Sequence, residues 1–369
     1  MFLTAIQLKN FRIHKDSTVK FSDNINFIVG GNGQGKTSII EAIYYLCTTK
    51  NYKSASDSEI VNFNGSEFEV GGTFKDLTED NIRIYFSLNE NKKHYILNGK
   101  HVSRSAEVIG KFPVVLLTPD DHSLTCGYPS DRRKFVDSVI SQASNVYLNT
   151  LLDYNKTLLQ RTSLLNQLNE RRDYSLLDEL DAWNMKLVLN GTELIKYRKK
   201  FVAEFNNYVA DSYQMIMDNV EVPLVEYQYL SGSNDNIEES FNRLLQERKE
   251  EEIRRGINLV GPHRDDFVFK INGASLKTYG SQGQHKTFQV ALRFAQFFYI
   301  KNMLGRLPVF LLDDVFGELD TKRAVKISEY LKHVGQAFIT ITDFSNFSFL
   351  KRSENDLMIK VNAGNVAYV

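Results

Sequence analysis

Runs of apolar residues, some continuous and some alternating with polar positions, predict that the first third of the chain is rich in β-strands. The candidate strands are Phe2–Leu8, Ile25–Val29, Glu67–Phe74, Ile82–Leu88, His94–Leu97 and Val114–Leu117. Two Asn-Gly pairs, Asn64-Gly65 and Asn98-Gly99, tolerate the positive φ that tight hairpin turns require. We therefore expect an antiparallel sheet between the first helix and residue 118.

The pattern changes to the period of helices from about residue 131 to residue 256, where Gly and Pro are scarce. One apolar stripe recurs every seven residues and consists of Leu180, Leu187, Leu194, Phe201 and Tyr208. A similar stripe between Leu148 and Leu168 predicts an antiparallel partner helix, and ordinary packing inside a bundle accounts for both stripes. We expect this stretch to be an all-helical insert with short antiparallel arms.

Strands and helices alternate again after residue 256. We expect an apolar helix from about Lys286 to Lys301 and buried strands at Val309–Leu312 and Ala337–Ile341. The two ends of the chain therefore predict one α/β head, with residues 1–130 and 257–369 as its two parts and residues 131–256 as the insert. The expected architecture is a mixed sheet with an antiparallel β subdomain and the helical insert.

Composition narrows the class of protein. The chain has 369 residues, 42% of them hydrophobic, and 45 Lys and Arg balance 45 Asp and Glu. This much apolar material favours a folded protein over a disordered one, and the neutral total argues against a surface that is positive all round. The two cysteines, Cys47 and Cys126, lack zinc-ligand spacing, and no apolar run is long enough to span a membrane. We expect a cytoplasmic protein with no membrane segment.

A glycine-rich loop between a candidate strand and a candidate helix predicts a nucleotide-binding site. The loop matches the spacing G-x-x-x-x-G-K-[ST] and consists of Gly30, Gly31, Asn32, Gly33, Gln34, Gly35, Lys36 and Thr37. Glycines allow backbone N–H groups to turn toward phosphate oxygens at a helix amino terminus, where the helix dipole also favours anions. Lys36 would reach the β- and γ-phosphates, and the Thr37 hydroxyl would bind Mg²⁺. The expected ligands are ATP and Mg²⁺.

An apolar strand that ends in two carboxylates supplies the second part of the predicted site. Val309–Leu312 is followed by Asp313 and Asp314, and the carboxyl ends of parallel strands lie beside the phosphates in nucleotide-binding sheets. We expect Asp313 to hold Mg²⁺ and Asp314 to orient or deprotonate the attacking water. Taken alone, two acidic residues after an apolar strand could equally serve only to cap the end of that strand.

A short turn before the apolar helix is the third feature. Ser281, Gly283 and Gln284 offer a hydroxyl and backbone N–H groups at a second helix amino terminus, where a plain helix cap would look similar. The turn precedes the acidic strand, and Gly317-Glu318-Leu319-Asp320 follows that strand. This order of phosphate loop, turn, acidic strand and final loop is typical of ABC-type ATPases.

Taken together, the motifs resemble those of the RecF family of bacterial recombination mediators, whose ATPase head is similar to those of SMC proteins and ABC transporters. The resemblance spans the whole chain. Besides the phosphate loop, it rests on Leu8-Lys9-Asn10-Phe11-Arg12, the run from Pro129 to Asp137, Gly261-Pro262-His263-Arg264-Asp265-Asp266 and Ser281-Gln282-Gly283-Gln284.

The resemblance implies a homodimer that closes around two ATP molecules, with Ser281 contacting the γ-phosphate held by the other subunit and Asp320 in a loop that communicates across the dimer. It also implies binding to gapped or duplex-junction DNA in the ATP state. The protein would then help RecR and RecO to place the RecA recombinase during repair and at replication forks. Slow, DNA-stimulated hydrolysis is expected to release the DNA.

The DNA contacts stay open at the level of single residues. His263, Arg264, Arg132 and Arg133 lie in the family motifs and are candidates either for DNA contact or for joining the insert to the head. A solvated helix face is the competing interpretation for each basic cluster.

Other roles and functions also stay open. Asp314 stands where ABC ATPases usually carry Glu, the loop Thr118–Asp121 has no glutamine to contact Mg²⁺, and Asp343 stands where transporters place a switch histidine. The main alternative function is the ATP-driving subunit of a transporter, which needs a membrane partner. A small-molecule kinase would leave the turn at Ser281 unexplained, and an SMC-like structural protein would need far longer coiled coils than this insert offers.

Overall fold

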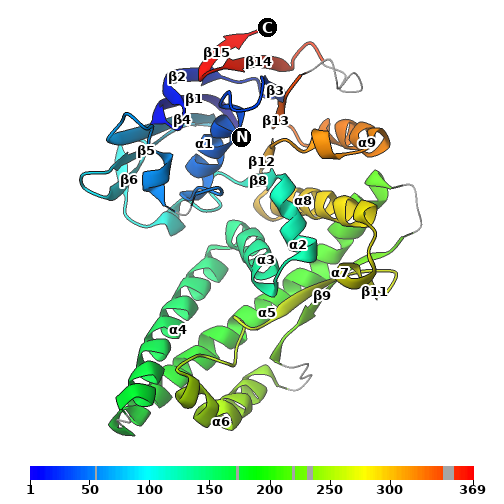
Figure 1. Cartoon of the computed structure of the whole chain (residues 1–369). Helices are drawn as coiled ribbons and strands as arrows, with labels where there is room; N and C mark the ends of the chain where they lie inside the picture. The colour runs from blue at the N-terminus through cyan, green and yellow to red at the C-terminus, as the bar shows by residue number, and fades with distance from the viewer. Residues whose placement is uncertain (55, 172–173, 218–220, 231–235, 344–352) are drawn as a thin grey trace. The chain divides into compact units, whose positions relative to one another are not determined.

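The computed structural model describes residues 1–54, 56–171, 174–217, 221–230, 236–343 and 353–369 (Figure 1). The chain divides into two compact units. Unit 1 comprises Met1–Asp121, Asp211–Val220 and Lys286–Val369, and unit 2 comprises His122–Ala210 and Glu221–His285. Residues 257–285, expected in the head, thus cluster with the helical unit. The domain boundaries at residues 130 and 256 stay a prediction.

Unit 1 contains a mixed sheet whose described strands follow the order β15-β14-β3-β13-β12-β8. The strands are β3 (Ile25–Val29), β8 (Val114–Leu117), β12 (Val309–Leu312), β13 (Ala337–Ile341), β14 (Leu357–Asn362) and β15 (Asn365–Tyr368). Neighbouring strands run parallel except β14 and β15, which form an antiparallel hairpin. The mixed sheet is confirmed, and β3, β13 and β12 place their carboxyl ends at one edge.

An antiparallel sheet forms the β subdomain of unit 1, in the order β2-β1-β4-β5-β6-β7. Its strands are β1 (Phe2–Phe11), β2 (His14–Lys20), β4 (Glu67–Lys75), β5 (Glu79–Ser87), β6 (Lys92–Leu97) and β7 (Lys100–Val102). Asn98 and Gly99 form the turn between β6 and β7, and both have the expected positive φ. The Asn64-Gly65 prediction is wrong, because the pair lacks positive φ and precedes β4 instead of joining two strands.

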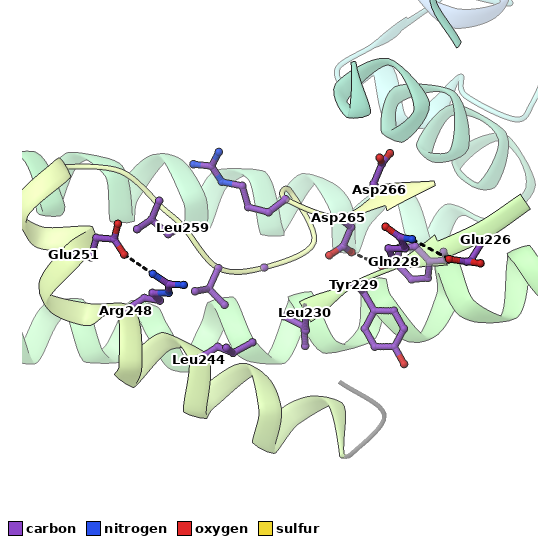
Figure 2. A pocket seen from close by; sticks show the side chains of 14 residues that line it. Glu226, Gln228, Tyr229, Leu230, Leu244, Arg248, Glu251, Leu259, Asp265 and Asp266 are labelled. Carbon is purple, nitrogen blue, oxygen red and sulfur yellow. Dashed lines mark hydrogen bonds and ion pairs between the residues drawn. The ribbon is translucent and has the colours of Figure 1, made fainter. Parts of the chain in front are cut away.

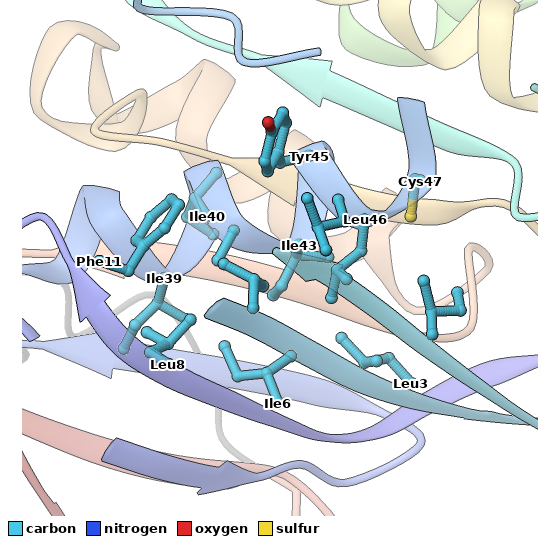
Figure 3. Packing of buried hydrophobic residues seen from close by; sticks show 14 of the residues in the cluster. Leu3, Ile6, Leu8, Phe11, Ile39, Ile40, Ile43, Tyr45, Leu46 and Cys47 are labelled. Atoms are coloured by element: carbon cyan, nitrogen blue, oxygen red, sulfur yellow. The ribbon is translucent and has the colours of Figure 1, made fainter. Parts of the chain in front are cut away.

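The helix that follows the phosphate loop, α1 (Lys36–Thr48), packs against both sheets of unit 1 (Figure 3). Ile39, Ile43 and Leu46 of α1 share one buried apolar cluster with Leu3 and Ile6 of β1, and strands β3 and β12 contribute further members. Burying a side chain of this size contributes about 1.5–3 kcal/mol relative to leaving it exposed. These contacts hold the first turn of α1 in place against the sheet edge.

The helix α8 (Gln282–Leu304) packs on β12, and α9 (Thr321–Leu331) packs on α8 in turn, since the ring of Tyr330 lies 4.5 Å from that of Phe294. The ring of Phe310 lies 4.9 Å from that of Phe294 and 5.9 Å from that of Phe297, both on α8. Its neighbours Val309 and Leu311 belong to the cluster around α1 instead. Since β12 is buried on both faces, its sequence is apolar without interruption.

Unit 2 is mainly helical. Its long helices, α4 (Asn145–Arg171) and α5 (Leu177–Ile216), run antiparallel, because Leu168 clusters with Leu180 whereas Tyr147 contacts Tyr197. Other α-helices that the structure describes in this unit are α2 (His122–Cys126), α3 (Pro129–Ala143), α6 (Ile237–Arg255) and α7 (Leu276–Tyr279). The predicted antiparallel arms are confirmed. None of the described helices is both long and apolar enough to cross a membrane.

The prediction that residues 131–256 are entirely helical is wrong. The strand β9 (Pro223–Gln228) lies within this range and pairs with β10 (Asp266–Ile271), which in turn pairs with β11 (Ala274–Ser275). The partner of β9 lies outside the expected insert, so residues 257–275 are needed to complete its sheet. This pairing is one reason why unit 2 extends past residue 256.

Candidate nucleotide-binding site

The phosphate loop joins β3 to α1, and its shape requires glycine at specific positions. Gly33 and Gly35 have φ values of 75° and 105°, a region that side chains with a Cβ rarely adopt. A Cβ on Gly30 would lie 2.3 Å from the carbonyl oxygen of Val361 on β14. The sheet therefore leaves no room for a larger residue at the start of the loop.

Lys36 is the first residue of α1, and its side chain lies across the phosphate loop. The ammonium group donates to the carbonyl oxygens of Gly30, at 2.7 Å, and Gly31, at 2.9 Å. Burial lowers the pKa of Lys36, and the negative charges of Asp314 and Asp313 oppose this shift. The structure thus holds a cation over the loop, close to two carboxylates.

Side chains distant in sequence support the phosphate loop. His14 Nε2 lies 3.1 Å from the Gly35 carbonyl oxygen, and His14 Nδ1 lies 3.0 Å from that of Gly364. The Gln34 side chain accepts a hydrogen bond of 2.7 Å from the N–H of Ala363, in the turn between β14 and β15. Burial lowers the pKa of His14, although both carbonyl contacts oppose the shift. Sequence reasoning missed His14, since a single histidine in a polar stretch gives no signal.

Asp313 lies at the carboxyl end of β12 and meets the phosphate loop. Its Oδ1 accepts hydrogen bonds from the hydroxyls of Thr37, at 3.0 Å, and Thr340, at 2.9 Å. The structure therefore brings together Thr37 and Asp313, which were predicted to hold Mg²⁺. A hydroxyl and a carboxylate are oxygen ligands of the kind that Mg²⁺ prefers, so these residues fit the ion. Their role as metal ligands stays a prediction.

Asp314 lies in a different environment from its neighbour. It is exposed, its φ is 56°, and its backbone N–H donates to the Thr340 hydroxyl at 2.8 Å. Thr340 on β13 therefore contacts both acids: its hydroxyl accepts from the Asp314 N–H and donates to the Asp313 carboxylate. The catalytic role of Asp314 stays a prediction, and its exposure suits a group that meets water.

Two residues that sequence reasoning missed also contact Asp313. The Tyr52 hydroxyl donates to Asp313 Oδ2 at 3.1 Å, and the Lys53 ammonium lies 3.3 Å from the same oxygen. Burial raises the pKa of Tyr52, and the charge of Asp313 adds to this shift. Neither residue belongs to a spaced motif, because both lie in the irregular connection after α1.

Arg12, the last residue of the Leu8-Lys9-Asn10-Phe11-Arg12 motif, ties the end of β1 to α1. Its guanidinium donates to both carboxylate oxygens of Glu41, at 2.9 and 3.1 Å, and Glu41 is buried. A bidentate pair of this kind fixes orientation as well as distance. The motif therefore braces the helix that carries Lys36.

The turn before α8 is a reciprocal helix cap. The Ser281 hydroxyl accepts from the Gln284 N–H at 3.2 Å, and the Gln284 side chain accepts from the Ser281 N–H at 2.8 Å. Gly283 lies in the first turn between them. Asp320 is likewise the cap of α9, where its carboxylate accepts from the Arg323 N–H at 3.1 Å. The contacts predicted for these residues across a dimer stay predictions.

The basic residues of the Pro129–Asp137 run contact the start of β10 within unit 2. The Arg132 guanidinium donates to both carboxylate oxygens of Asp266 at 2.8 Å, and Arg133 donates to the Asp265 carbonyl at 2.6 Å. Arg132 is buried. These contacts give both arginines partners inside the unit, and a role in DNA binding stays a prediction.

His263 and Arg264 close the loop between α6 and β10. His263 Nδ1 lies 2.8 Å from the Tyr154 hydroxyl, and Arg264 donates to the Asn258 carbonyl at 3.0 Å. Burial lowers the pKa of His263 to about 4, and nearby arginines add to the effect. His263 is therefore a neutral group that fastens this loop to α4. Its predicted DNA contact remains a prediction too.

A pocket of about 870 Å³ lies in unit 2 beside this loop (Figure 2). Arg248 and Glu251 of α6 lie at one end and Glu226 and Gln228 of β9 at the other. Arg248 donates to Glu251 at 2.7 Å, so these two charges balance each other. The pocket has both polar and apolar lining residues, among them Leu230 and Leu259.

The comparisons with known proteins agree with this geometry. A family model described as the RecF/RecN/SMC N terminal domain matches residues 2–364. The chain is 39% identical over 362 residues to the DNA replication and repair protein RecF of Chloroherpeton thalassium. This match covers 95% of this chain and 98% of that protein. The chain belongs to the RecF family. Its identity to RecF of Salinibacter ruber is 35% over 351 residues, or 93% of this chain and 85% of that one.

Solved structures give the same result. A structure of the recombination mediator protein RecF with ATP, described as part of the RecFOR pathway, has a TM-score of 0.91 and 31% identity, covering 100% of this chain and 97% of the other. An Smc head domain from Pyrococcus furiosus, 16% identical with a TM-score of 0.58, shares the fold. The predicted family and the α/β ATPase-head fold are confirmed.

Proposed function

We propose that this protein is an ATP-switched DNA clamp of recombinational repair and replication-fork maintenance. The observation that carries the proposal is the contact between the phosphate loop and Asp313, whose Oδ1 lies 3.0 Å from the Thr37 hydroxyl. The relatives that match this chain over nearly their full length are DNA replication and repair proteins. The similar structure of RecF with ATP supports ATP as the ligand. The proposed location is the cytoplasm, where bacterial DNA lies.

In this proposal each residue of the site has a distinct task. Lys36 and the backbone N–H groups of the loop bind the phosphates, and Thr37 and Asp313 hold Mg²⁺, which would balance the charge on the transferred phosphoryl group. Asp314 orients or deprotonates the attacking water. Because Asp is one methylene shorter than the Glu that ABC ATPases usually carry, we expect slow hydrolysis that serves as a switch.

We further propose that ATP closes a homodimer on DNA. Ser281, Gly283 and Gln284 of each subunit would face the nucleotide held by the other, and Asp320 would lie in the loop that communicates across the dimer. The exposed Ser281 side chain at the amino terminus of α8 supports this assignment, since such a terminus favours anions. The proposed partners are gapped or duplex-junction DNA, RecR, and indirectly RecO and RecA. The naming of the RecFOR pathway for similar structures supports these partners.

The proposal is tested by sedimentation of the purified protein with duplex DNA, with ATP and Mg²⁺ or without nucleotide. We expect a dimer on DNA only with ATP, because a ligand shifts only an equilibrium to which it binds differentially. Lys36→Ala should lose ATP binding and the ATP-dependent DNA complex, whereas Ser281→Arg should bind ATP as a monomer. Equal DNA affinity in both nucleotide states would refute the switch, and stable co-purification with an integral membrane protein would favour the transporter alternative.

A further inference from the structure

Asp313 has a complete set of partners before any ion or nucleotide is considered. The hydroxyls of Thr37 and Thr340 donate to Oδ1, and the Tyr52 hydroxyl and Lys53 ammonium lie on Oδ2, at 3.1 and 3.3 Å. Only 3% of the Asp313 side chain is exposed. A buried carboxylate needs a counter-charge, and among the residues that the structure describes Lys53 is the one whose charged group forms an ion pair with Asp313.

The segment that carries Lys53 has a defined backbone. The Asn51 side chain accepts from the N–H groups of Lys53, at 2.7 Å, and Ser54, at 3.1 Å, which forms a local Asx-type turn. The Ser54 hydroxyl also accepts a hydrogen bond from Arg12. The backbone therefore directs Lys53 toward Asp313, and the contact does not depend on a free loop.

Lys53 is nevertheless able to leave. Its side chain is 39% exposed, so the ammonium group can turn into water without crossing the core. A divalent cation bound to Thr37 and Asp313 would repel an ammonium group on the same carboxylate, because like charges at contact distance are unfavourable even near a surface. The two cations therefore compete for one carboxylate.

We propose that Lys53 is a tethered counter-cation for Asp313, which neutralises the carboxylate until Mg²⁺ arrives with the nucleotide and thereby sets the Mg²⁺ concentration that nucleotide binding requires. This inference rests on the proposed function in that Asp313 is the metal-binding carboxylate. Lys53 acts through Asp313 and is a positioning residue, whereas Lys36 binds phosphates.

The test is the Mg²⁺ dependence of binding of a fluorescent ATP analogue, measured at equilibrium under conditions that exclude hydrolysis. Lys53→Gln should lower the Mg²⁺ concentration for half-maximal binding by about twofold to fivefold, the range expected for loss of one partly exposed ion-pair partner. Lys53→Arg keeps the charge and should retain the wild-type midpoint. Lys50→Gln, which removes an exposed lysine from the same connection, is the matched control and should also retain it.

Hydrogen exchange supplies a second measurement on the same proteins. The amides of Lys53 and Ser54 donate to the Asn51 side chain and should keep their protection in Lys53→Gln, so that a changed Mg²⁺ midpoint reports loss of the charge and not loss of the turn. An unchanged or raised Mg²⁺ midpoint for Lys53→Gln would overturn the inference while leaving the proposed function intact. Absence of any Mg²⁺-dependent analogue binding by the wild-type protein would overturn both.

Discussion

Replacing Thr340 tests whether hydrogen bonds or packing hold the acidic edge of the sheet. Thr340 is 1% exposed, and its hydroxyl both donates to Asp313 and accepts from the Asp314 N–H. Thr340→Val keeps the shape and removes both bonds. Thr340→Ser keeps the bonds and removes one methyl group.

The two substitutions differ in expected magnitude. A hydrogen bond to a charged group contributes about 1.5–3 kcal/mol and a neutral one about 0.5–1.5 kcal/mol, so Thr340→Val should reduce the free energy of unfolding by about 2–4 kcal/mol. Loss of one buried methyl group in Thr340→Ser should cost about 1 kcal/mol. The Val variant should therefore be the less stable one.

Native-state hydrogen exchange of the amides in β12 and β13 measures this difference within unit 1. The single Trp of the chain, Trp183, lies on α5 in unit 2, so its fluorescence during urea unfolding serves as an internal control on the other unit. If Thr340→Ser lowered the protection of β13 more than Thr340→Val, packing would dominate at this position and the reasoning would be wrong.

Three further predictions concern other positions. Gly30→Ala should lower the melting temperature and weaken ATP binding at least tenfold, since its Cβ would lie 2.3 Å from a carbonyl oxygen. Gly31→Ala should leave the melting temperature unchanged, because the atom nearest to its Cβ would belong to a flexible side chain and lie 3.7 Å away. Arg161→Ala should destabilise unit 2 by about 3–5 kcal/mol in urea unfolding followed by Trp183 fluorescence, because it leaves Glu252, also 1% exposed, as a buried charge without its ion-pair partner. Arg161→Lys keeps the charge but cannot reach Asn184, Asn258 and Glu252 together, so it should cost less, and an equal effect of both substitutions would contradict the role of the ion pair. In unit 2, burial lowers the pKa of His263 to about 4 and raises that of Asp265 to about 6. As the pH falls from 6.5, protonation of the histidine stabilises the unfolded state, whereas protonation of the aspartate stabilises the folded state. Asp265→Asn should therefore make the free energy of unfolding of unit 2 fall more steeply between pH 6.5 and 4. An unchanged pH dependence would show that protonation of Asp265 does not offset protonation of His263.

Local patterns were enough where one short segment carries the whole signal. The phosphate loop is contiguous, so its glycines, lysine and threonine were identified without knowledge of the fold. The strands Val309–Leu312 and Ala337–Ile341 were predicted to the residue because both are buried on two faces and read as uninterrupted apolar runs.

Other elements depend on partners that the sequence does not mark. The strand β2 was missed because two of its buried side chains are the polar His14 and Ser17, which lie within hydrogen-bonding distance of the Gly364 carbonyl oxygen instead of joining an apolar core. The strand β9 was missed because its sheet is completed by residues beyond the helical stretch. Tyr52 lies 261 residues before Asp313 in the sequence, and Lys53 is the next residue after Tyr52, so no spacing rule connects either of them with Asp313.

The contacts between the phosphate loop and the turn after β14 have a consequence for synthesis of the chain. Gln34 and Ala363 are 329 residues apart, so a ribosome that has finished the phosphate loop has most of the protein still to translate before the support of that loop exists. At about 5–20 residues per second, the nascent chain spends tens of seconds without this contact to the loop. A chain that stops before β14 is therefore expected to bind ATP poorly even though it contains every residue of the phosphate-binding motif.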